Sequence, residues 1–250
     1  MSVTTFAVAG ATGRLGRHVV DVLTEQGYRV VPMSRATGVD VITGEGLAEA
    51  LTGAEVIIDV ASSHSSDQDA ATEFFRTSAR NLHEYGRKAG VAQITMASII
   101  GADKATAGFL AAKKAHEELL LSGPIPVRIL RAAQFHEFVG RLLDRRQGDV
   151  AYLPELPTQL VACRTVAEEL VGLATAPAAP GTPIPEIAGP RKEIMAEAGR
   201  LLGARRGVKV VGIDGSGMPD AGLAAAGAFL PGPHATLAGP TFREWLDARP

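Results

Sequence analysis

The chain has 250 residues, of which 46% are hydrophobic and 21% charged, so it can bury a core and its composition excludes a disordered protein. Its formal net charge of -2 gives no basic surface for nucleic acid, and no apolar run reaches the ~18 residues of a membrane span. The single cysteine, Cys163, excludes an internal disulfide and a multi-cysteine metal site. The first residues show no signal-peptide pattern, so we expect a cytoplasmic protein without nucleic-acid or membrane partners.

The first half of the chain alternates short apolar runs with amphipathic segments. We expect strands at 6–9, 29–33, 56–60, 94–97 and 127–130, and helices at 15–26, 69–89 and 107–121. This alternation predicts an α/β fold, a doubly wound parallel sheet with helices on both faces. Such sheets bind ligands beyond the carboxyl ends of their strands. Functional residues are therefore expected at 10–16, 34–35, 61–64, 98–99 and 131–135.

The second half is rich in proline, which predicts shorter elements joined by loops. A capping-box pattern at 165–168 predicts a helix that runs to Thr175. Beyond it we expect a strand within 177–190, a helix at 195–202, a strand at 207–211, and a helix at 221–230 that forms a lid. No linker separates the halves. We therefore expect a single domain, with a core of about 1–130 and a small substrate-side region of about 131–250 interleaved with the last sheet elements.

The first predicted strand ends in a glycine motif that opens a helix. Glycines allow a tight turn and let a pyrophosphate approach the backbone, while the helix N-terminus offers free N–H groups and a positive dipole end. The strand–loop–helix context is the one that a dinucleotide-binding fingerprint requires, although a glycine turn without a ligand is the alternative. The residues expected to line the pyrophosphate are Gly10, Thr12, Gly13, Arg14, Leu15 and Gly16.

The end of the second predicted strand indicates which dinucleotide binds. NAD sites usually place an acid there against the ribose 2′-OH, whereas this chain has Ser34 and Arg35. An arginine can hold the 2′-phosphate of NADP in a fork, and Arg14 is expected to close over the same phosphate. We therefore expect NADPH to be preferred over NADH, the alternative being a solvated arginine in a turn. Asp40 and Val41 are expected to border the adenine, or Asp40 is simply a turn residue.

Several segments together resemble the atypical short-chain dehydrogenase/reductases, and most closely the NmrA-like NAD(P)H-binding family with its quinone and triphenylmethane reductases. These segments are Gly10–Gly16 with Arg35, Met96–Ile99, Ala112–Glu118, Leu130–Phe135 and Leu237–Leu246. The resemblance covers nearly the whole chain and implies a Rossmann fold, an NADP cofactor, and contact of Lys113 with the nicotinamide ribose. The further cofactor-binding residues that it implies, mostly at the nicotinamide end, are Ala61, Ser62, Ser63, Ala97, Ala133, Gln134 and Phe135.

The chain departs from this pattern at the catalytic tyrosine. Related reductases carry a Tyr four residues before the Lys, with a Ser at the end of the preceding strand. Here Ser98 and Lys113 are present, but Phe109 occupies the tyrosine position and cannot donate a proton. We expect Phe109 to form an apolar wall near the nicotinamide. The alternative for Ser98 is a capping hydroxyl, and the alternative for Lys113 is a place on a solvated helix face. Lys114 is the competing lysine if the register is one residue off.

A histidine is the remaining candidate for a proton donor. His64 and His136 both fall near predicted strand ends, where an imidazole can supply a proton near neutral pH, the alternative for each being a surface or packed histidine. His136 is the third candidate catalytic residue beside Lys113 and Ser98, whereas His116 lies on a predicted helix and receives no role. The histidine spacing does not suit zinc, so we expect no metal.

The function predicted from these residues is that of an NADPH-dependent oxidoreductase. Its substrate is expected to be a small conjugated or aromatic compound, because such acceptors take up hydride with little help from an acid. The alternatives are an NADP-sensing regulator without turnover, and a non-redox biosynthetic enzyme on the same fold. We expect a monomer or a homodimer.

Overall fold

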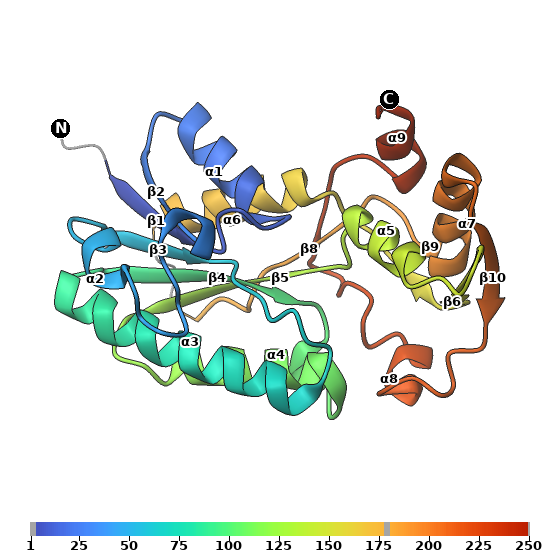
Figure 1. The fold of residues 1–250 in the computed structure, drawn as a ribbon, viewed down its shortest axis with the longest axis horizontal. Helices are drawn as coiled ribbons and strands as arrows, with labels where there is room; N and C mark the ends of the chain where they lie inside the picture. Colours follow the sequence, from blue (N-terminus) through green and yellow to red (C-terminus); the bar gives the residue numbers. More distant parts are fainter. Residues whose placement is uncertain (1–3, 178–180, 250) are drawn as a thin grey trace.

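The computed structural model describes residues 4–177 and 181–249, so residues 1–3, on which the signal-peptide argument partly rests, lie outside the described residues. Within that part, a seven-stranded parallel sheet has the spatial order β2-β1-β3-β4-β5-β8-β11 (Figure 1). Its strands are β1 (Thr5–Ala9), β2 (Arg29–Met33), β3 (Val56–Asp59), β4 (Gln93–Ile99), β5 (Val127–Ala132), β8 (Glu186–Ala188) and β11 (Thr236–Leu237). The predicted Rossmann-type, doubly wound fold is confirmed.

The direction in which the chain crosses the sheet reverses at β1. β2 pairs with one side of β1 and β3 with the other, and Ala9 lies opposite both Met33 and Asp59. The carboxyl ends of these three strands are therefore level with one another. Ligands of open α/β sheets bind at such a reversal, outside the carboxyl ends of the strands.

Helices cover both faces of the sheet, as the alternating pattern predicts (Figure 1). One face carries α1 (Gly16–Glu25) and α6 (Cys163–Thr175), which pack on Phe6, Val8 and Ile58. The other face carries α2 (Leu47–Ala50), α3 (Gln68–Ala89) and α4 (Gly108–Leu121), around a core that includes Ile57 and Met96. Successive strand residues point to opposite faces, so Asp59, two residues after Ile57, belongs to the face with α3 and α4.

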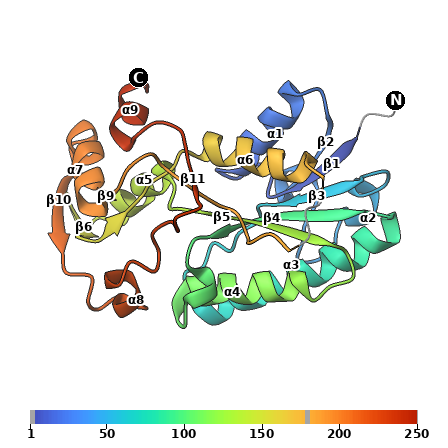
Figure 2. The same cartoon turned by 180° about the vertical axis from the view of Figure 1, so that it is seen from behind.

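The remaining elements lie beyond the carboxyl ends of the large sheet (Figures 1 and 2). They are α5 (His136–Asp144), β6 (Val150–Pro154), β7 (Pro157–Thr158), β9 (Glu193–Ile194), α7 (Met195–Arg206), β10 (Lys209–Ile213), α8 (Ala221–Ala225) and α9 (Phe242–Asp247). β6 and β10 form a separate parallel pair. A third core, which includes Val139, Leu153, Leu202 and Phe242, holds this part together. The chain returns from it to the large sheet through α6, β8 and β11.

Several elements of the second half differ from the sequence prediction. The capping box at 165–168 is wrong, because α6 begins at Cys163 after Ala162 and has no side-chain cap. Thr165 is thus inside the helix. The helix expected at 221–230 spans only Ala221–Ala225, whereas α7 continues to Arg206 and β10 begins at Lys209. α5, a helix that the sequence prediction did not include, follows the fifth strand after only three residues.

No helix in residues 4–177 or 181–249 combines the length and the apolar character that crossing a membrane requires.

Candidate dinucleotide site

The loop between β1 and α1 is shaped by its first and last glycines. Gly10 has φ +79, in the left-handed region that suits glycine, and a Cβ there would lie 2.8 Å from the Ala61 nitrogen. A Cβ on Gly16 would overlap the carbonyl oxygen of Gly10. The Gly10 amide donates to the Met33 carbonyl at 2.9 Å, which joins the loop to β2. These two glycines allow the chain to turn tightly against the ends of two neighbouring strands.

The middle glycine instead faces outward. Gly13 is exposed, and a Cβ there would approach only the Gly10 oxygen, at 3.0 Å. Thr12, Gly13 and Arg14 are exposed and lead directly into α1, while Leu15 is buried in the core. The cap residue of α1 provides no side-chain acceptor, and its first turn contains no acid. The positive end of this helix is therefore open to an anionic group such as a pyrophosphate.

The end of β2 presents an arginine toward solvent. Arg35 is exposed, and its Nη2 lies 3.4 Å from the Nε2 of His64. The ion pairs found in the described part of the chain include none with Arg35 or Arg14. The Ser34 hydroxyl lies 3.3 Å from that of Thr37 in the turn that follows. The two arginines are thus not neutralised by a carboxylate.

Asp40 forms the turn after this segment. Its Oδ1 accepts hydrogen bonds from the amides of Ile42 at 2.7 Å and Thr43 at 3.4 Å. The carbonyl of Val41 accepts a hydrogen bond from the Asn81 side chain at 2.9 Å, which anchors the loop to α3. The turn alternative therefore describes Asp40, and contact of Asp40 and Val41 with an adenine stays a prediction.

The segment after β3 lies directly against the glycine loop. The amide of Ala61 donates to Asp59 Oδ1 at 3.0 Å, and Ala61 is buried at the position where Gly10 lacks a side chain. Ser62 is exposed, and the Ser63 hydroxyl accepts a hydrogen bond from the Ser65 amide at 3.1 Å. The structure thus brings Ala61 against Gly10, while contact of Ala61–Ser63 with the nicotinamide stays a prediction.

The end of β4 contributes the hydroxyl of Ser98. Ser98 is 3% exposed, and its Oγ has no hydrogen-bond partner within the described residues. It lies opposite Arg131 in the sheet register, one residue after the buried Ala97. An unpartnered buried hydroxyl is costly, which is typical of a group kept for a ligand. A capping role for Ser98 is not seen, since Oγ bonds to no backbone group of the described chain.

The segment after β5 continues along the same edge of the sheet. The Ala133 amide donates to the Ile187 carbonyl at 2.9 Å. Gln134 Oε1 accepts a hydrogen bond from the Thr158 hydroxyl at 2.8 Å, and Phe135 packs on the core that contains α1 and α6. Ala133 is therefore held by β8 of the large sheet, whereas Gln134 is held by β7 from the part of the chain beyond it.

Lys113 is buried, whereas its neighbour Lys114 is only half-buried, so the solvated-face alternative does not describe it. Its Nζ lies 3.2 Å from Nδ1 of His116, and His116 Nε2 lies 3.2 Å from Asp59 Oδ2. Neither of those last two atoms has a hydrogen bond of good geometry within the described residues, so the contact between them is a close electrostatic one. We call Asp59, His116 and Lys113 the buried triad. The ring of Phe75 lies under Lys113 Nζ, at 4.6 Å, and is stacked on His116.

Burial and mutual contact change the charges of the triad. Burial lowers the pKa of Lys113 to about 8, although the carboxylates of Asp59 and Glu117 oppose the fall. Burial also opposes the charge of Asp59, but contact with His116 and the charge of Lys113 outweigh it, so its pKa lies below the ordinary value. The pKa of His116 is lowered, first by burial and then by Lys113. At neutral pH the triad therefore holds a carboxylate, a neutral imidazole and an ammonium group.

Sequence analysis missed two members of this triad. His116 received no role, and Asp59 was treated as the end of an apolar strand. Two signals pointed to them. His116 follows Lys113 by three residues, a spacing that places both on one helix face. Asp59 is a charged residue in an otherwise apolar strand, and buried charges in proteins are paired.

A second buried ion pair lies next to the triad. Arg131 Nε and Nη2 donate to the two carboxylate oxygens of Glu117 at 3.0 and 2.6 Å, and Nη1 lies 3.3 Å from Asp103. The side chains of Glu117 and Arg131 are 5% and 13% exposed. This fork joins α4 to β5 and fixes the helix that carries Lys113.

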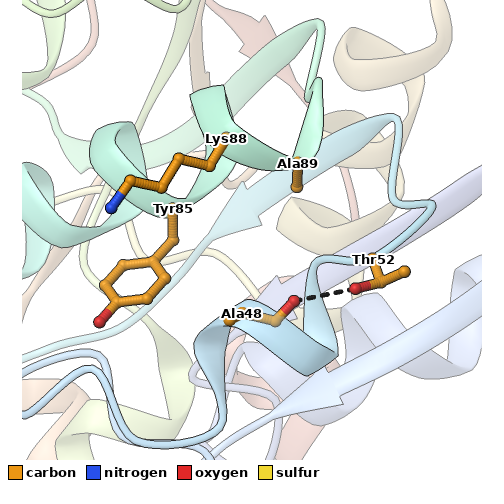
Figure 3. Close-up of a pocket in the computed structure, with 5 residues that line it drawn as sticks. All are labelled: Ala48, Thr52, Tyr85, Lys88 and Ala89. Atoms are coloured by element: carbon orange, nitrogen blue, oxygen red, sulfur yellow. Dashed lines mark hydrogen bonds between the residues drawn. The ribbon is translucent and has the colours of Figure 1, made fainter.

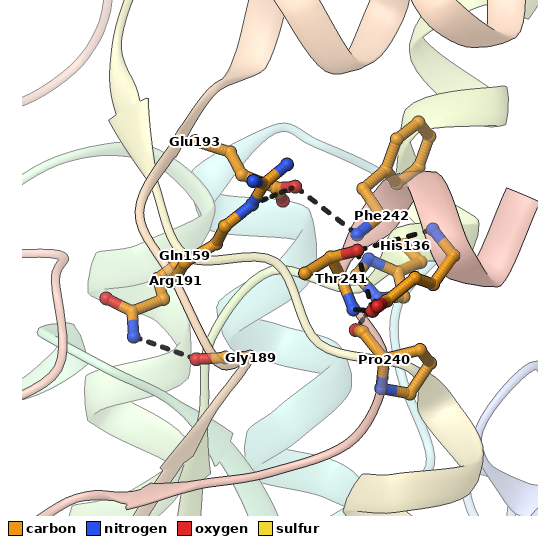
Figure 4. Close-up of polar contacts among 9 residues, drawn as sticks. His136, Gln159, Gly189, Arg191, Glu193, Pro240, Thr241 and Phe242 are labelled. Atoms are coloured by element: carbon orange, nitrogen blue, oxygen red, sulfur yellow. Dashed lines mark hydrogen bonds and ion pairs between the residues drawn. The ribbon is translucent and has the colours of Figure 1, made fainter.

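His136 lies in a different part of the molecule from Ser98 and Lys113. Its side chain is buried, its Nε2 donates to the Pro240 carbonyl at 3.0 Å, and its ring lies against Phe242 (Figure 4). Burial lowers its pKa, although the bond to Pro240 opposes the fall. No contact within the described residues joins it to the other two. His136 ties α5 to the C-terminal segment, and these contacts argue against the catalytic role predicted for it.

Phe109 packs on the apolar side of the triad. Its ring is half-buried and meets Phe75 edge to face, with the ring centroids 5.8 Å apart. Phe75 in turn supports both Lys113 and His116. Phe109 therefore lies one ring away from the buried triad, while its position relative to a nicotinamide stays a prediction.

The segment that carries α8 is docked on the loop before α4. The carboxylate of Asp220 accepts hydrogen bonds from the Thr106 amide at 2.9 Å, the Thr106 hydroxyl at 2.6 Å and the Ala107 amide at 3.1 Å. Asp220 has φ +56, an unusual value for a residue other than glycine. This contact joins the α8 segment to the start of α4, and the expected movement as a lid stays a prediction.

Two other observations concern sites elsewhere. A surface depression of about 360 Å³ is lined by Ala48, Thr52, Tyr85, Lys88 and Ala89 (Figure 3). It lies at the last turn of α3, toward the amino ends of the strands, and thus away from the glycine loop. Among residues 4–177 and 181–249, no group of three or more His, Cys, Asp and Glu side chains could hold a metal ion.

Residues 10–141, which include the glycine loop, Arg35, Ser98 and Lys113, match the family model described as NAD(P)H-binding. The chain belongs to the NAD(P)H-binding family. A ceramide reductase of Caulobacter vibrioides is 28% identical over 252 residues, covering 90% of this chain and 76% of the relative. The resemblance to the atypical short-chain dehydrogenase/reductases is thereby confirmed.

Solved structures agree on the fold. A short-chain dehydrogenase/reductase superfamily protein from Agrobacterium tumefaciens, with bound NAD, has a TM-score of 0.66 at 18% identity, covering 97% of this chain and 95% of the other. The UDP-glucose 4-epimerase of Thermus thermophilus in complex with NAD also has a TM-score of 0.66, at 16% identity, covering 99% and 94%. At these identities the likeness shows the fold alone.

Proposed function

We propose that this protein is an NADPH-dependent reductase that passes a hydride to a small conjugated or aromatic acceptor. The observation that carries the proposal is the juxtaposition of an open glycine loop, at Gly13, with a buried lysine and an unpartnered buried serine hydroxyl on neighbouring elements. The name of the curated relative, a reductase, supports the redox assignment. The site residues fit a dinucleotide, since the backbone at Gly13 leaves room and α1 presents its positive end.

Each group of the site takes a role that follows from its place. The loop at 10–16 and the start of α1 hold the pyrophosphate, and Arg35, with Ser34 and Arg14, holds a 2′-phosphate. Lys113 hydrogen-bonds the nicotinamide ribose. Ser98 Oγ orients the acceptor by donating to its oxygen. The bound nicotinamide supplies the hydride. The segments 61–63 and 133–135 exclude water from the reacting end, and Phe109 contributes an apolar surface.

The absence of a phenol at position 109 predicts the choice of acceptor. With NADPH, the native protein should turn over quinones faster than simple ketones. The anion that a quinone forms on accepting a hydride is delocalised, whereas the alkoxide formed from a ketone is not. The measurement is NADPH oxidation across a matched panel of ketones and quinones. Efficient ketone reduction with one essential acid in its pH profile would contradict the proposed acceptor class. Tight NADPH binding without turnover of any acceptor would favour a sensing role instead.

Arg35 should determine the choice of cofactor. Arg35→Asp should weaken NADPH binding by about 1.5–3 kcal/mol, the range for hydrogen bonds to a charged group, and should leave NADH binding unchanged or improved. Titration calorimetry with both dinucleotides measures this preference. Arg29→Asp is a matched control, because Arg29 is an exposed arginine at the other end of the same strand. Equal affinity of the native protein for NADPH and NADH would refute the assignment.

A further inference from the structure

The buried triad leaves little freedom for Lys113. The side chains of Asp59, His116 and Lys113 are 0%, 1% and 6% exposed, and they come from β3 and from two positions on α4. Buried charges are costly unless they are paired, and each group here is within 3.2 Å of the next. Asp59 also binds the Ala61 amide, so the same carboxylate touches the segment that packs against the glycine loop. The triad thus connects the lysine with the end of β3.

We propose that Asp59 and His116 are positioning residues that fix the direction and the charge of the Lys113 amine for cofactor binding. The inference rests on the proposed function, in which Lys113 touches the nicotinamide ribose. His116 does more than pack against its neighbours in this arrangement. Its two ring nitrogens face a cation and an anion, and only one tautomer suits both.

The charges of Asp59 and Lys113 determine which ring nitrogen of His116 carries the proton. The Asp59 carboxylate can only accept, so His116 Nε2 carries the proton and donates toward Oδ2. His116 Nδ1 is then unprotonated and accepts from the Lys113 ammonium. The other two N–H groups of the ammonium remain to donate to other acceptors, such as ribose hydroxyls. Asp59→Asn would exchange the protonated and unprotonated nitrogens of His116. The amide would donate to Nε2, so the ring proton would lie on Nδ1, facing the lysine.

The other groups around Lys113 do not replace this arrangement. Glu117, on its own helix, is the second carboxylate that supports the charge of Lys113. Both Glu117 oxygens are already held by Arg131, which also pairs with Asp103. From α3, the ring of Phe75 faces the ammonium. The hydrogen-bond acceptor that Lys113 keeps inside the protein is therefore His116.

The proposal predicts a pH dependence of NADP+ affinity. Lys113 is charged below about pH 8 and loses its proton as the pH rises through that value, because burial has lowered its pKa. Affinity should fall about tenfold across this titration, the difference between charged and neutral hydrogen bonds. Titration calorimetry between about pH 7 and 9.5 measures it, above the second phosphate pKa of roughly 6. An affinity that is constant across this range would overturn the proposal.

Four variants separate positioning from simple packing. Asp59→Asn and His116→Leu should move the midpoint of the NADP+ affinity profile about one pH unit or more lower, since each removes support for the ammonium. His116→Gln should restore the native midpoint, because an amide can accept from Lys113 and donate to Asp59. His83→Leu is the control, as His83 is similarly buried but contacts only the backbone of Leu120 and Ile125. A native midpoint in the first two variants, or a shift in the control of the same size, would refute the role.

Nitrogen NMR of the cofactor-free protein tests the triad separately from the function. His116 should be neutral at pH 7, with its proton on Nε2, and Asp59→Asn should move that proton to Nδ1. A proton on Nδ1 in the native protein would overturn the inference even if NADP+ binds. Conversely, if NMR finds the expected tautomer but NADP+ does not bind, the proposed function fails and the role in cofactor binding fails with it.

Discussion

Gly13→Val should abolish dinucleotide binding and leave the fold intact. The position is exposed, its backbone is not in the left-handed region, and a Cβ there meets only the Gly10 oxygen. The branched side chain would instead occupy the space into which a pyrophosphate must come to reach the backbone. We expect affinity for NADPH to fall at least about 100-fold, or roughly 2.7 kcal/mol. Calorimetric titration measures the binding, and circular dichroism with thermal unfolding reports on the fold.

The neighbouring glycine provides the contrast. Gly16→Val should destabilise the protein itself, because its Cβ would overlap the backbone of Gly10 and Ala11. The two variants carry the same substitution three residues apart in one loop. If Gly13→Val folds and binds NADPH with native affinity, the motif is only a turn. If both variants unfold equally, the middle glycine is structural as well, and the loop has no open position.

The sheet could be predicted from sequence because its signals are local and repeated. Each of the first five strands is a short apolar run. Of the long helices of the first half, α3 is capped by Gly90, α4 is capped by Ser122, and α1 ends two residues before Gly27. The order of the strands then follows from the fold class. In the second half, β8 and β11 have three and two residues, so their place in the sheet depends on pairing across long stretches of chain. No local pattern encodes that pairing.

The candidate site shows the same division. The glycine loop, Arg35 and Lys113 are motif residues, and they lie within residues 10–141, which match the family model. The surroundings of Lys113 could not be predicted, because Asp59 and His116 meet only when β3 and α4 pack on the same face of the sheet. His136 illustrates the converse. It follows a strand that ends at the site, but the C-terminal segment folds back and covers it. Sequence adjacency to a site does not determine the direction of a side chain.

Arg131→Met should cost about 3–5 kcal/mol of unfolding free energy, the range for breaking one side of a buried ion pair. The reason is the partner that remains. Glu117 is 5% exposed, and Arg131 is the side chain that neutralises both of its oxygens. Without the arginine, a buried carboxylate loses its counter-charge and two hydrogen bonds. Urea unfolding at neutral pH measures the loss.

An arginine on the surface tests whether burial is the cause. Arg164 forms the same two-pronged contact with Glu25, at 2.9 and 2.6 Å, but both side chains are largely exposed. Arg164→Met should therefore destabilise far less, since solvent screens exposed pairs and solvates the carboxylate that is left. Equal losses in the two variants would show that geometry, and not burial, determines the strength of these pairs.

The double variant Arg131→Met with Glu117→Leu completes the argument. Removing both charges eliminates the uncompensated carboxylate. The double variant should therefore recover most of the stability lost in Arg131→Met. The coupling between the two positions, taken from the four unfolding free energies, should be large because the residues are in direct contact. A double variant that is less stable than Arg131→Met would mean that the fork contributes to stability through packing. In that case the link between α4 and β5, and with it the position of Lys113, would depend on the shape of these side chains more than on their charge.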